Sequence, residues 1–298
     1  MRSNFNSSSK PKLACEIAAD RVIAGRVSER GGSVETCATG ELTAGSVVPD
    51  LMEANVRERK RVFDTIQETL GGVSNRSRDV IAVLPDAAVR VMLLDFDALP
   101  AKHTEAESVV RFRLKKSLPF DLDKAKISYH AQPAASGIKV VAAVALASVI
   151  EDYESVFRDA GYNPGIVLPS MLAALGAADA DRPTLVVKVD ARTTSIAILD
   201  KNQLLLFRTL ENPRGVTITG EQLAEEVYPS VVFFQDTYHL NIEHIFIAGL
   251  ADVAGAVPAL RAQTDAEVTE LVGSSQLGAG VGSIPKWRIA GVVGALLS

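Results

Sequence analysis

The sequence predicts an α/β protein whose two halves share one pattern, with a separate module inserted in the first half. Three observations predict this class. Strands alternate with helices along the chain, an acid-bearing hairpin pattern occurs twice, and 298 residues are about twice the usual ~150-residue domain. A hydrophobic fraction of 47% and a charged fraction of 22% are typical of a globular chain.

The first half opens with a predicted hairpin. Residues 13–27 alternate apolar and polar side chains on both sides of a short turn at 18–20, which predicts two short antiparallel strands. We expect a helix over roughly 49–71, beginning near Pro49 and ending at a pair of glycines. The apolar run 80–84 then predicts a buried strand, so helices should cover a sheet.

The middle of the chain is predicted to form an inserted α+β subdomain and then to return to the first half. A helix over 149–160, ending at Gly161, marks that return. Within the subdomain we expect strands at 89–96, 126–132 and 138–146 and a helix at 104–117. The predicted domains are a first lobe of 1–85 plus 149–181, an inserted subdomain of 86–148, and a second lobe of 182–298.

The second half repeats the opening theme. Residues 184–199 again form an apolar strand, an acid, a turn of small residues and a second strand. We interpret Glu16 and Asp190 as occupying the same place in this pattern. Pro229 should kink or divide the predicted helix 220–238. Strands are expected at 204–210 and 245–248.

Charge and hydropathy exclude several classes of function. A net charge of -5 gives no general attraction to nucleic acid, and the longest apolar runs, 140–150 and 289–297, are shorter than the ~20 residues that span a bilayer. The polar start lacks the pattern of a secretory signal, so we expect a cytosolic protein. Cys15 and Cys37 lack CxxC spacing and are expected to be reduced thiols. The four histidines show no spacing that favours a metal site.

Two halves that each open with an acid-bearing hairpin, with a module inserted in the first, resemble the actin-like (ribonuclease H-like) ATPase fold. The chain is most similar to the PilM family, cytoplasmic type IV pilus assembly proteins that are related to FtsA and dock on the inner-membrane protein PilN. The resemblance covers nearly the whole chain. It is carried by VRFRLKKSLPFDLDKAKISYH at 110–130 and by VVAAVALASVIEDYESVFRDAGYNPGIVLPSMLAAL at 140–175.

The resemblance also implies a place for a nucleotide, between two hairpin turns whose glycines admit the phosphates. The matching residues are Glu16 and Asp20 in the first turn, Asp190, Arg192, Thr193 and Thr194 in the second, and Gly249 after a later strand. Both turns lack glycine, and the stretch 208–226 is shorter than in the family, which implies a reduced second lobe. We therefore expect a non-catalytic protein with no resident cofactor. The alternative is a switch that binds ATP with Mg²⁺ through Asp190.

Arg192 has two interpretations. It either supplies charge to a phosphate in place of missing backbone donors, or it is an exposed turn residue with no ligand. The basic cluster Arg57, Arg59, Lys60 and Arg61 is likewise either a contact for membrane phosphates or a solvated helix face.

For the PilM family, a groove between the first subdomain and the inserted module accepts the N-terminal segment of PilN. The resemblance implies that the groove is lined or braced by Arg111, Phe112, Leu114, Lys115, Phe120 and Tyr129, and the alternative is that these residues form the module's own core. We expect a scaffold at the inner face of the inner membrane, held there by a PilN-like partner. Self-association into a homo-oligomer is left open.

A third alternative is the cytoplasmic domain of a GspL-like type II secretion protein, which shares the fold and the weak nucleotide motifs. That family carries a transmembrane helix after the domain. This chain reaches Ser298 without such a helix, and its last residues, IAGVVGALLS at 289–298, resemble the last helix of PilM. We therefore expect the stand-alone form.

Overall fold

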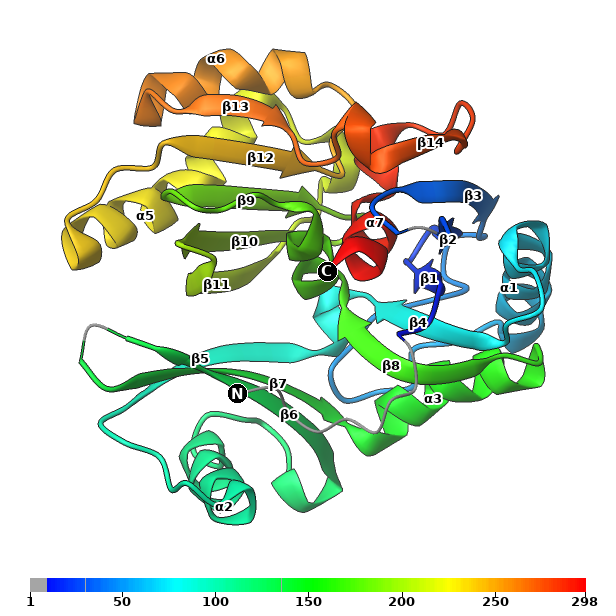
Figure 1. The fold of residues 1–298 in the computed structure, drawn as a ribbon, viewed down its shortest axis with the longest axis horizontal. Helices are drawn as coiled ribbons and strands as arrows, with labels where there is room; N and C mark the ends of the chain where they lie inside the picture. The colour runs from blue at the N-terminus through cyan, green and yellow to red at the C-terminus, as the bar shows by residue number, and fades with distance from the viewer. Residues whose placement is uncertain (1–9, 30, 135) are drawn as a thin grey trace.

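The computed structural model describes residues 10–29, 31–134 and 136–298, and these residues build three β-sheets (Figure 1). The first sheet has six strands in the order β14-β3-β2-β1-β4-β8. These strands are β1 (Leu13–Ile17), β2 (Arg21–Val27), β3 (Val34–Glu41), β4 (Asp79–Leu84), β8 (Asn163–Pro169) and β14 (Leu277–Gly280). The N-terminal residues 1–9, on which the expectation of no secretory signal rests, lie outside the described residues.

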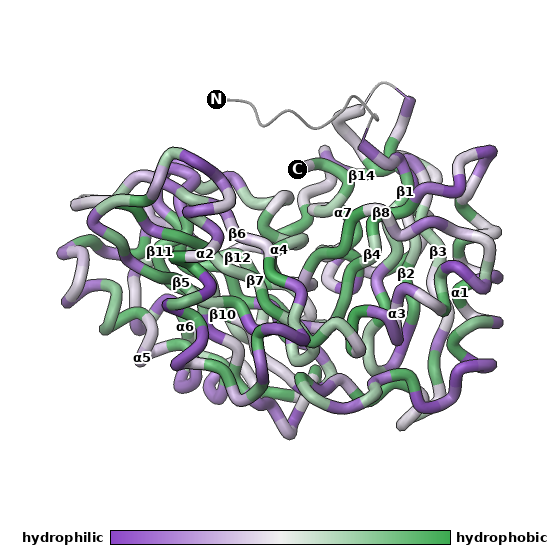
Figure 2. Tube along the Cα trace, turned by 90° about the horizontal axis from the view of Figure 1, so that it is seen from below, coloured by the Kyte–Doolittle hydropathy of each residue, from purple (hydrophilic) through white to green (hydrophobic). Residues whose placement is uncertain are grey.

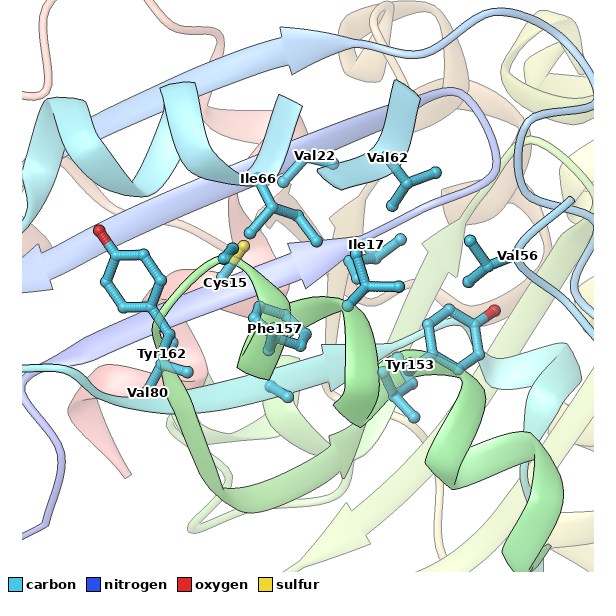
Figure 3. Packing of buried hydrophobic residues seen from close by; sticks show 14 of the residues in the cluster. Cys15, Ile17, Val22, Val56, Val62, Ile66, Val80, Tyr153, Phe157 and Tyr162 are labelled. Carbon is cyan, nitrogen blue, oxygen red and sulfur yellow. The ribbon is translucent and has the colours of Figure 1, made fainter. Parts of the chain in front are cut away.

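Helices cover both faces of the first sheet: α1 (Arg59–Val73) and α3 (Ala147–Asp159) on one face, α4 (Ser170–Ala174) and α7 (Ala290–Leu297) on the other. Side chains alternate along β1, so Cys15 packs with α1 and α3 while Ala14 packs with α4 and α7. Figure 3 shows Cys15 among Ile66 of α1 and Phe157 of α3. This two-sided burial explains why β1 is apolar throughout except for Glu16.

The second lobe repeats the first. Its sheet has the order β11-β10-β9-β12-β13, which matches β3-β2-β1-β4-β8 strand for strand in both order and direction. The predicted repeat is therefore confirmed. The elements are β9 (Thr184–Val189), β10 (Thr193–Asp200), β11 (Gln203–Glu211), β12 (His244–Ala248) and β13 (Glu267–Glu270), with helices α5 (Gly220–Tyr238) and α6 (Val253–Thr264).

The inserted segment forms its own small sheet, with β5 (Arg90–Phe96), β6 (Ala125–Pro133) and β7 (Ile138–Leu146) in the order β5-β7-β6 and helix α2 (His103–Leu114) on one face. Along β7, Val140, Ala142 and Val144 pack with Val110 and Leu114 of α2. The β7 residues between these three point to the opposite face of the module sheet and pack against the two lobes. The exact domain boundaries stay a prediction.

Short 3-10 segments complete the described chain. They are η1 (Asp86–Ala88), η2 (Leu122–Lys124), η3 (Leu175–Ala177), η4 (Gly215–Thr217), η5 (Ser274–Gln276) and η6 (Lys286–Arg288). No helix within the described ranges is both long enough and apolar enough to cross a bilayer.

One expectation about helices is wrong, and one of two alternatives is excluded. The helix expected from Pro49 begins at Arg59, because residues 49–58 form a loop whose backbone is satisfied by side chains. The carboxylate of Asp50 accepts from the amides of Met52 and Glu53, and Asp152 of α3 accepts from the amide of Asn55. Of the two alternatives expected at Pro229, a division of the helix is excluded, because α5 runs continuously through this residue, and a kink stays a prediction.

The basic cluster near α1 is neutralised by local partners. Arg57 pairs with Glu53, Arg59 with Asp159, and Lys60 with Asp64, while Arg61 donates to the carbonyl of Glu41. The geometry favours a solvated helix face over a membrane contact. Cys15 and Cys37 are free thiols, as expected, and burial raises the pKa of both.

Candidate functional site

The first candidate site is the contact between the two β-hairpins, one from each lobe. In the first hairpin Ile17 pairs with Val22, and in the second Val189 pairs with Thr194. When the two hairpins are aligned by this register, Glu16 is equivalent to Lys188 and Ala18 is equivalent to Asp190. The interpretation that Glu16 and Asp190 are equivalent is therefore wrong by two residues, because the acids alone do not reveal where each hairpin pairs.

Lys188 is the centre of a buried charge network between the lobes. Its Nζ lies 2.6 Å from Asp190 Oδ2 and 3.4 Å from Glu16 Oε1, and the hydroxyl of Ser170 donates to Glu16. Burial favours the neutral amine, but the carboxylates of Asp190 and Glu16 outweigh it and raise the pKa of Lys188. The ammonium group thus stays charged and joins an acid of the first lobe to an acid of the second.

Arg21 adds a second cation to this network. Its guanidinium donates to both carboxylate oxygens of Asp20, at 2.9 and 2.8 Å, and lies 3.9 Å from Asp190. The Arg21 side chain is buried. Asp20 is therefore engaged within its own turn, and Arg21 and Lys188 offset part of the negative charge of these acids.

Asp86 makes the third link between the lobes. Its carboxylate accepts from the amide of Met171 at 2.8 Å and from the hydroxyl of Ser195, on β10 of the second lobe, at 2.7 Å. Burial is the main cause that raises the pKa of Asp86 to about 6, and the nearby Lys188 opposes it. The carboxyl group consequently changes protonation within an accessible pH range.

The space directly between the two hairpin turns is small in this arrangement. The cavity between them, lined by residues that include Ala18, Ala19 and Ala191, has a volume of about 20 Å³, which suits a single water molecule. Two turn amides are already used, since Ala18 donates to the carbonyl of Arg21 and Asp190 to that of Thr193. Neither turn contains a residue with positive φ, so no phosphate cradle of the glycine type is formed.

The remaining predicted nucleotide residues have structural contacts or lie on the rim. Thr193 and Thr194 are buried, and Thr194 accepts from the amide nitrogen of Asn212 at 3.1 Å. Gly249 has φ of 78°, and a Cβ there would lie 1.7 Å from the carbonyl oxygen of Val189, so packing alone requires glycine. Arg192 is exposed and borders a larger cleft.

That larger cleft, with a volume of about 900 Å³, opens between the lobes and the inserted module. Its wall includes Arg192 from the second hairpin, Arg90 from the module and Asp50 from the loop before α1. Within the described chain, neither Arg90 nor Arg192 forms an ion pair with a carboxylate. The hydrogen bonds from Met52 and Glu53 are the first cause that lowers the pKa of Asp50, and Arg57 and Arg192 lower it further. The cleft is therefore mixed in charge.

A second candidate site, which we call the module groove, lies between the inserted module and the first lobe. It has a volume of about 270 Å³. Its lining residues are Val89, Lys126, Ile127, Ser128, Ala143, Ala145, Ile150, Glu154, Val167 and Pro169. Lys126 of β6 pairs with Glu154 of α3 at 3.2 Å and so bridges the two walls. Both adjoining strands, β6 and β8, are edge strands of their sheets.

The six residues expected near a partner groove do not line the module groove. Arg111, Phe112, Leu114 and Lys115 belong to or follow α2, which covers the other face of the module sheet. Leu114 is fully buried in the module core, and Phe120 and Tyr129 pack at the edge of that core. Arg111 pairs with Glu107 at 3.0 Å. Whether they take part in partner binding stays a prediction.

The sequence analysis missed the residues that connect the lobes: Arg21, Asp86, Ser170, Lys188 and Ser195. One signal was available, since Lys188 is the only charged side chain in the apolar strand TLVVKV and Asp86 directly follows VIAVLP. A charge within a run that must be buried needs a partner. The identity of that partner is not visible until the hairpins are brought together.

Comparison with known proteins supports the architecture. No protein-family model and no curated protein matches the sequence. Among solved structures, the chain is similar to one described as a "PilM-PilN type IV pilus biogenesis complex", with 18% identity, 97% coverage of both chains and a TM-score of 0.76. It is also similar to the cytoplasmic domain of EpsL, an inner-membrane component of the type II secretion system of Vibrio cholerae (10% identity, 96% and 94% coverage, TM-score 0.54).

A third similar structure is a Bacteroides thetaiotaomicron protein with an actin-like ATPase fold and unknown function, at 10% identity, with 94% and 97% coverage and a TM-score of 0.53. Together with the repeated sheets, these likenesses show that the chain has the actin-like ATPase fold. The resemblance to PilM is confirmed at the level of the fold. At such low identity the fold does not transfer an activity.

Proposed function

We propose that this chain is a non-catalytic scaffold for type IV pilus or related secretion assembly, which binds the N-terminal cytoplasmic segment of a PilN-like inner-membrane protein. The proposal is supported by the likeness to a chain whose structure is described as a PilM-PilN complex. It places the protein in the cytoplasm, at the inner face of the inner membrane through its partner. The module groove is the observation that carries it.

The module groove suits a short extended peptide. Ile127, Ala145 and Val167 offer apolar contacts, while β6 and β8 each have one edge to which no other strand of the described residues pairs. An added segment therefore gains main-chain hydrogen bonds from an edge and affinity from a few buried anchors. The Lys126–Glu154 bridge is a polar contact that a bound segment would pass beside or displace.

A matched pair of variants tests the groove. Ser128→Trp fills it from an exposed position, and Ser283→Trp places the same side chain at an exposed position that does not line it. We expect Ser128→Trp to weaken binding of a labelled N-terminal peptide of the PilN-like partner by at least about 10-fold, since the anchors lose their pocket. Ser283→Trp should bind as the unmodified protein does. Equal affinity for both variants would exclude the module groove.

The nucleotide-switched alternative is favoured by one observation, the cleft of about 900 Å³ with Arg90 and Arg192 at its wall. Thermal unfolding with and without millimolar Mg-ATP tests it, because a ligand at about 100 times its Kd adds ~2.7 kcal/mol to the free energy of unfolding. The scaffold proposal expects no shift in Tm. A shift that disappears in Asp190→Ala would support the switch instead.

A further inference from the structure

Two strands at the edges of their sheets line the larger cleft. β11 is the last strand of the second-lobe sheet and β5 is the last strand of the module sheet, and no other strand of the described residues pairs with the outer edge of either. Figure 1 and, from below, Figure 2 show the two strands side by side. The cleft is lined by residues 207–211 of β11 and by residues 89–91 at the beginning of β5. An edge strand with unpaired main-chain groups can accept a further strand.

Hydrogen bonds on the other side of β11 define which main-chain groups are open. Just beyond the strand, the amide of Asn212 donates to the carbonyl of Arg192, so these two residues form a hydrogen-bonded pair. In an antiparallel ladder, hydrogen-bonded pairs alternate with pairs that are not hydrogen-bonded. The main-chain groups of Phe207, Thr209 and Glu211 therefore point away from β10, toward the outer edge of the sheet.

The other end of this edge is closed by a side chain of the module. The amide group of Gln132, on β6, donates to the carbonyl of Leu204 at 2.6 Å and accepts from its amide at 3.2 Å. Gln132 thus occupies the edge of β11 as a paired strand does. A register shift of the β10–β11 ladder, between Ile198 and Leu199, separates Leu204 from the open residues. The module satisfies β11 at Leu204 and leaves residues 207–211 open to the cleft.

The side chains of the cleft favour an occupant that carries an acid among apolar residues. Arg90 and Arg192 are exposed, and within the described ranges neither pairs with a carboxylate. The carboxylate of Asp50 is held by amides of its own loop. Glu211 is an exposed acid at the end of β11 and disfavours a second acid directly beside it. Apolar contacts are offered by Leu51, Met52, Val91 and Pro119.

We propose that the larger cleft is a docking site for an extended segment of a partner protein, which adds a strand to β11 at 207–211 and places an acidic side chain near Arg90 and Arg192. Main-chain hydrogen bonds supply affinity, while the guanidinium groups and the apolar wall select the segment. Val89 is the one lining residue that this cleft shares with the module groove. The docking site is therefore independent of the binding of a PilN-like peptide.

Proline at an open amide tests the added strand. Thr209→Pro removes an N–H that does not bond to β10, so the ladder of the sheet is kept. Thr209→Val keeps this N–H and controls for the loss of the hydroxyl. Glu270→Pro is the matched proline control on β13, the other edge of the same sheet. There the amide of Leu271 bonds to β12, so that of Glu270 points to the open side. Circular dichroism confirms that each variant folds.

The probe is a library of random heptapeptides displayed on phage and selected on the unmodified protein. We expect enriched peptides that carry an acid among apolar residues. Their synthetic forms should bind at least about 10-fold more weakly to Thr209→Pro and to Arg90→Glu/Arg192→Glu, as measured by fluorescence anisotropy. Binding should be unchanged in the two controls above and in Arg76→Glu/Lys201→Glu, which makes the same change of charge at exposed positions outside the cleft.

Hydrogen exchange locates the bound peptide. Exchange should slow at the amides of Phe207, Thr209 and Glu211 and stay unchanged at Leu204, which Gln132 already holds. The proposal is overturned if no peptide is enriched, if every binder is lost in Ser128→Trp and so belongs to the module groove, or if binders tolerate both Thr209→Pro and the charge reversal. Displacement of the peptides by millimolar Mg-ATP that protects the same amides would assign the cleft to a nucleotide instead.

Discussion

The ammonium group of Lys188 in the second lobe lies 3.4 Å from the carboxylate of Glu16 in the first. The hairpin register makes these two residues equivalent positions of the repeated halves. Opposite charges at equivalent positions meet where the two hairpins face each other, at the place where the actin-like resemblance implies phosphates. The chain therefore supplies cations of its own at this contact.

Removing Lys188 should destabilise the protein strongly. Lys188→Met leaves Glu16 and Asp190 buried without their cation, and breaking a buried pair in this way costs about 3–5 kcal/mol. Urea unfolding measures the loss in the free energy of unfolding. Adding Glu16→Gln to Lys188→Met should recover part of it, since one uncompensated charge is removed. A loss below 1 kcal/mol, comparable to that of exposed Lys201→Met, would contradict the network.

Asp86 should make stability depend on pH in the acid range. With a pKa of about 6 in the folded protein and ~3.9 in the unfolded chain, Asp86 takes up a proton on folding between about pH 4 and 6. This contribution is fully present below pH ~4, and it is lost as the pH rises through 6, by up to about 3 kcal/mol. Asp86→Asn has no proton to lose.

The measurement is the difference in the free energy of unfolding between Asp86→Asn and the unmodified protein at several pH values, because other carboxylates cancel in it. The variant should gain relative stability as the pH rises from 4 to 6 and change little above 7. A difference that stays constant over this range would show that Asp86 is ionised throughout.

Gly249→Ala should destabilise the protein whether or not a nucleotide is present. The added Cβ would meet the carbonyl oxygen of Val189, and φ of 78° is unfavourable for alanine. We expect a loss of more than about 2 kcal/mol by urea unfolding. Gly282→Ala, with φ of 68° but open space around it, should lose only about 1 kcal/mol. Similar losses at both positions would remove the packing argument.

Gln132 should couple the inserted module to the second lobe. Its side chain donates to the carbonyl of Leu204 at 2.6 Å and accepts from the amide of Leu204 at 3.2 Å, and it is buried. Gln132→Ala leaves both backbone groups without partners and should cost about 1–3 kcal/mol. Hydrogen exchange should rise at the amide of Leu204. Exchange there that equals that of the control Gln203→Ala would show that the clamp does not hold the module.

Local pattern predicted most of the strands and the repeat of the halves, because period-two alternation and apolar runs report burial directly. It failed over 49–58, where Asp50 and Asn55 satisfy the backbone through side-chain hydrogen bonds that compete with helix formation. It also failed in aligning the two acids, since hairpin register depends on pairing across the strand. The expected role of the α2 residues in partner binding stays a prediction, because the sequence did not show which face of the module sheet the helix covers.

The chain's own residue pattern determined the α/β class, the duplicated halves and the loss of glycine from both hairpin turns, because these depend on neighbours in sequence. The tertiary structure alone decided that Lys188 and Arg21 offset part of the negative charge between the lobes, and that the module groove is lined by β6, β7, α3 and β8. Each of these depends on groups far apart in the chain. Only the packing of the lobes and the module brings such groups within reach of one another.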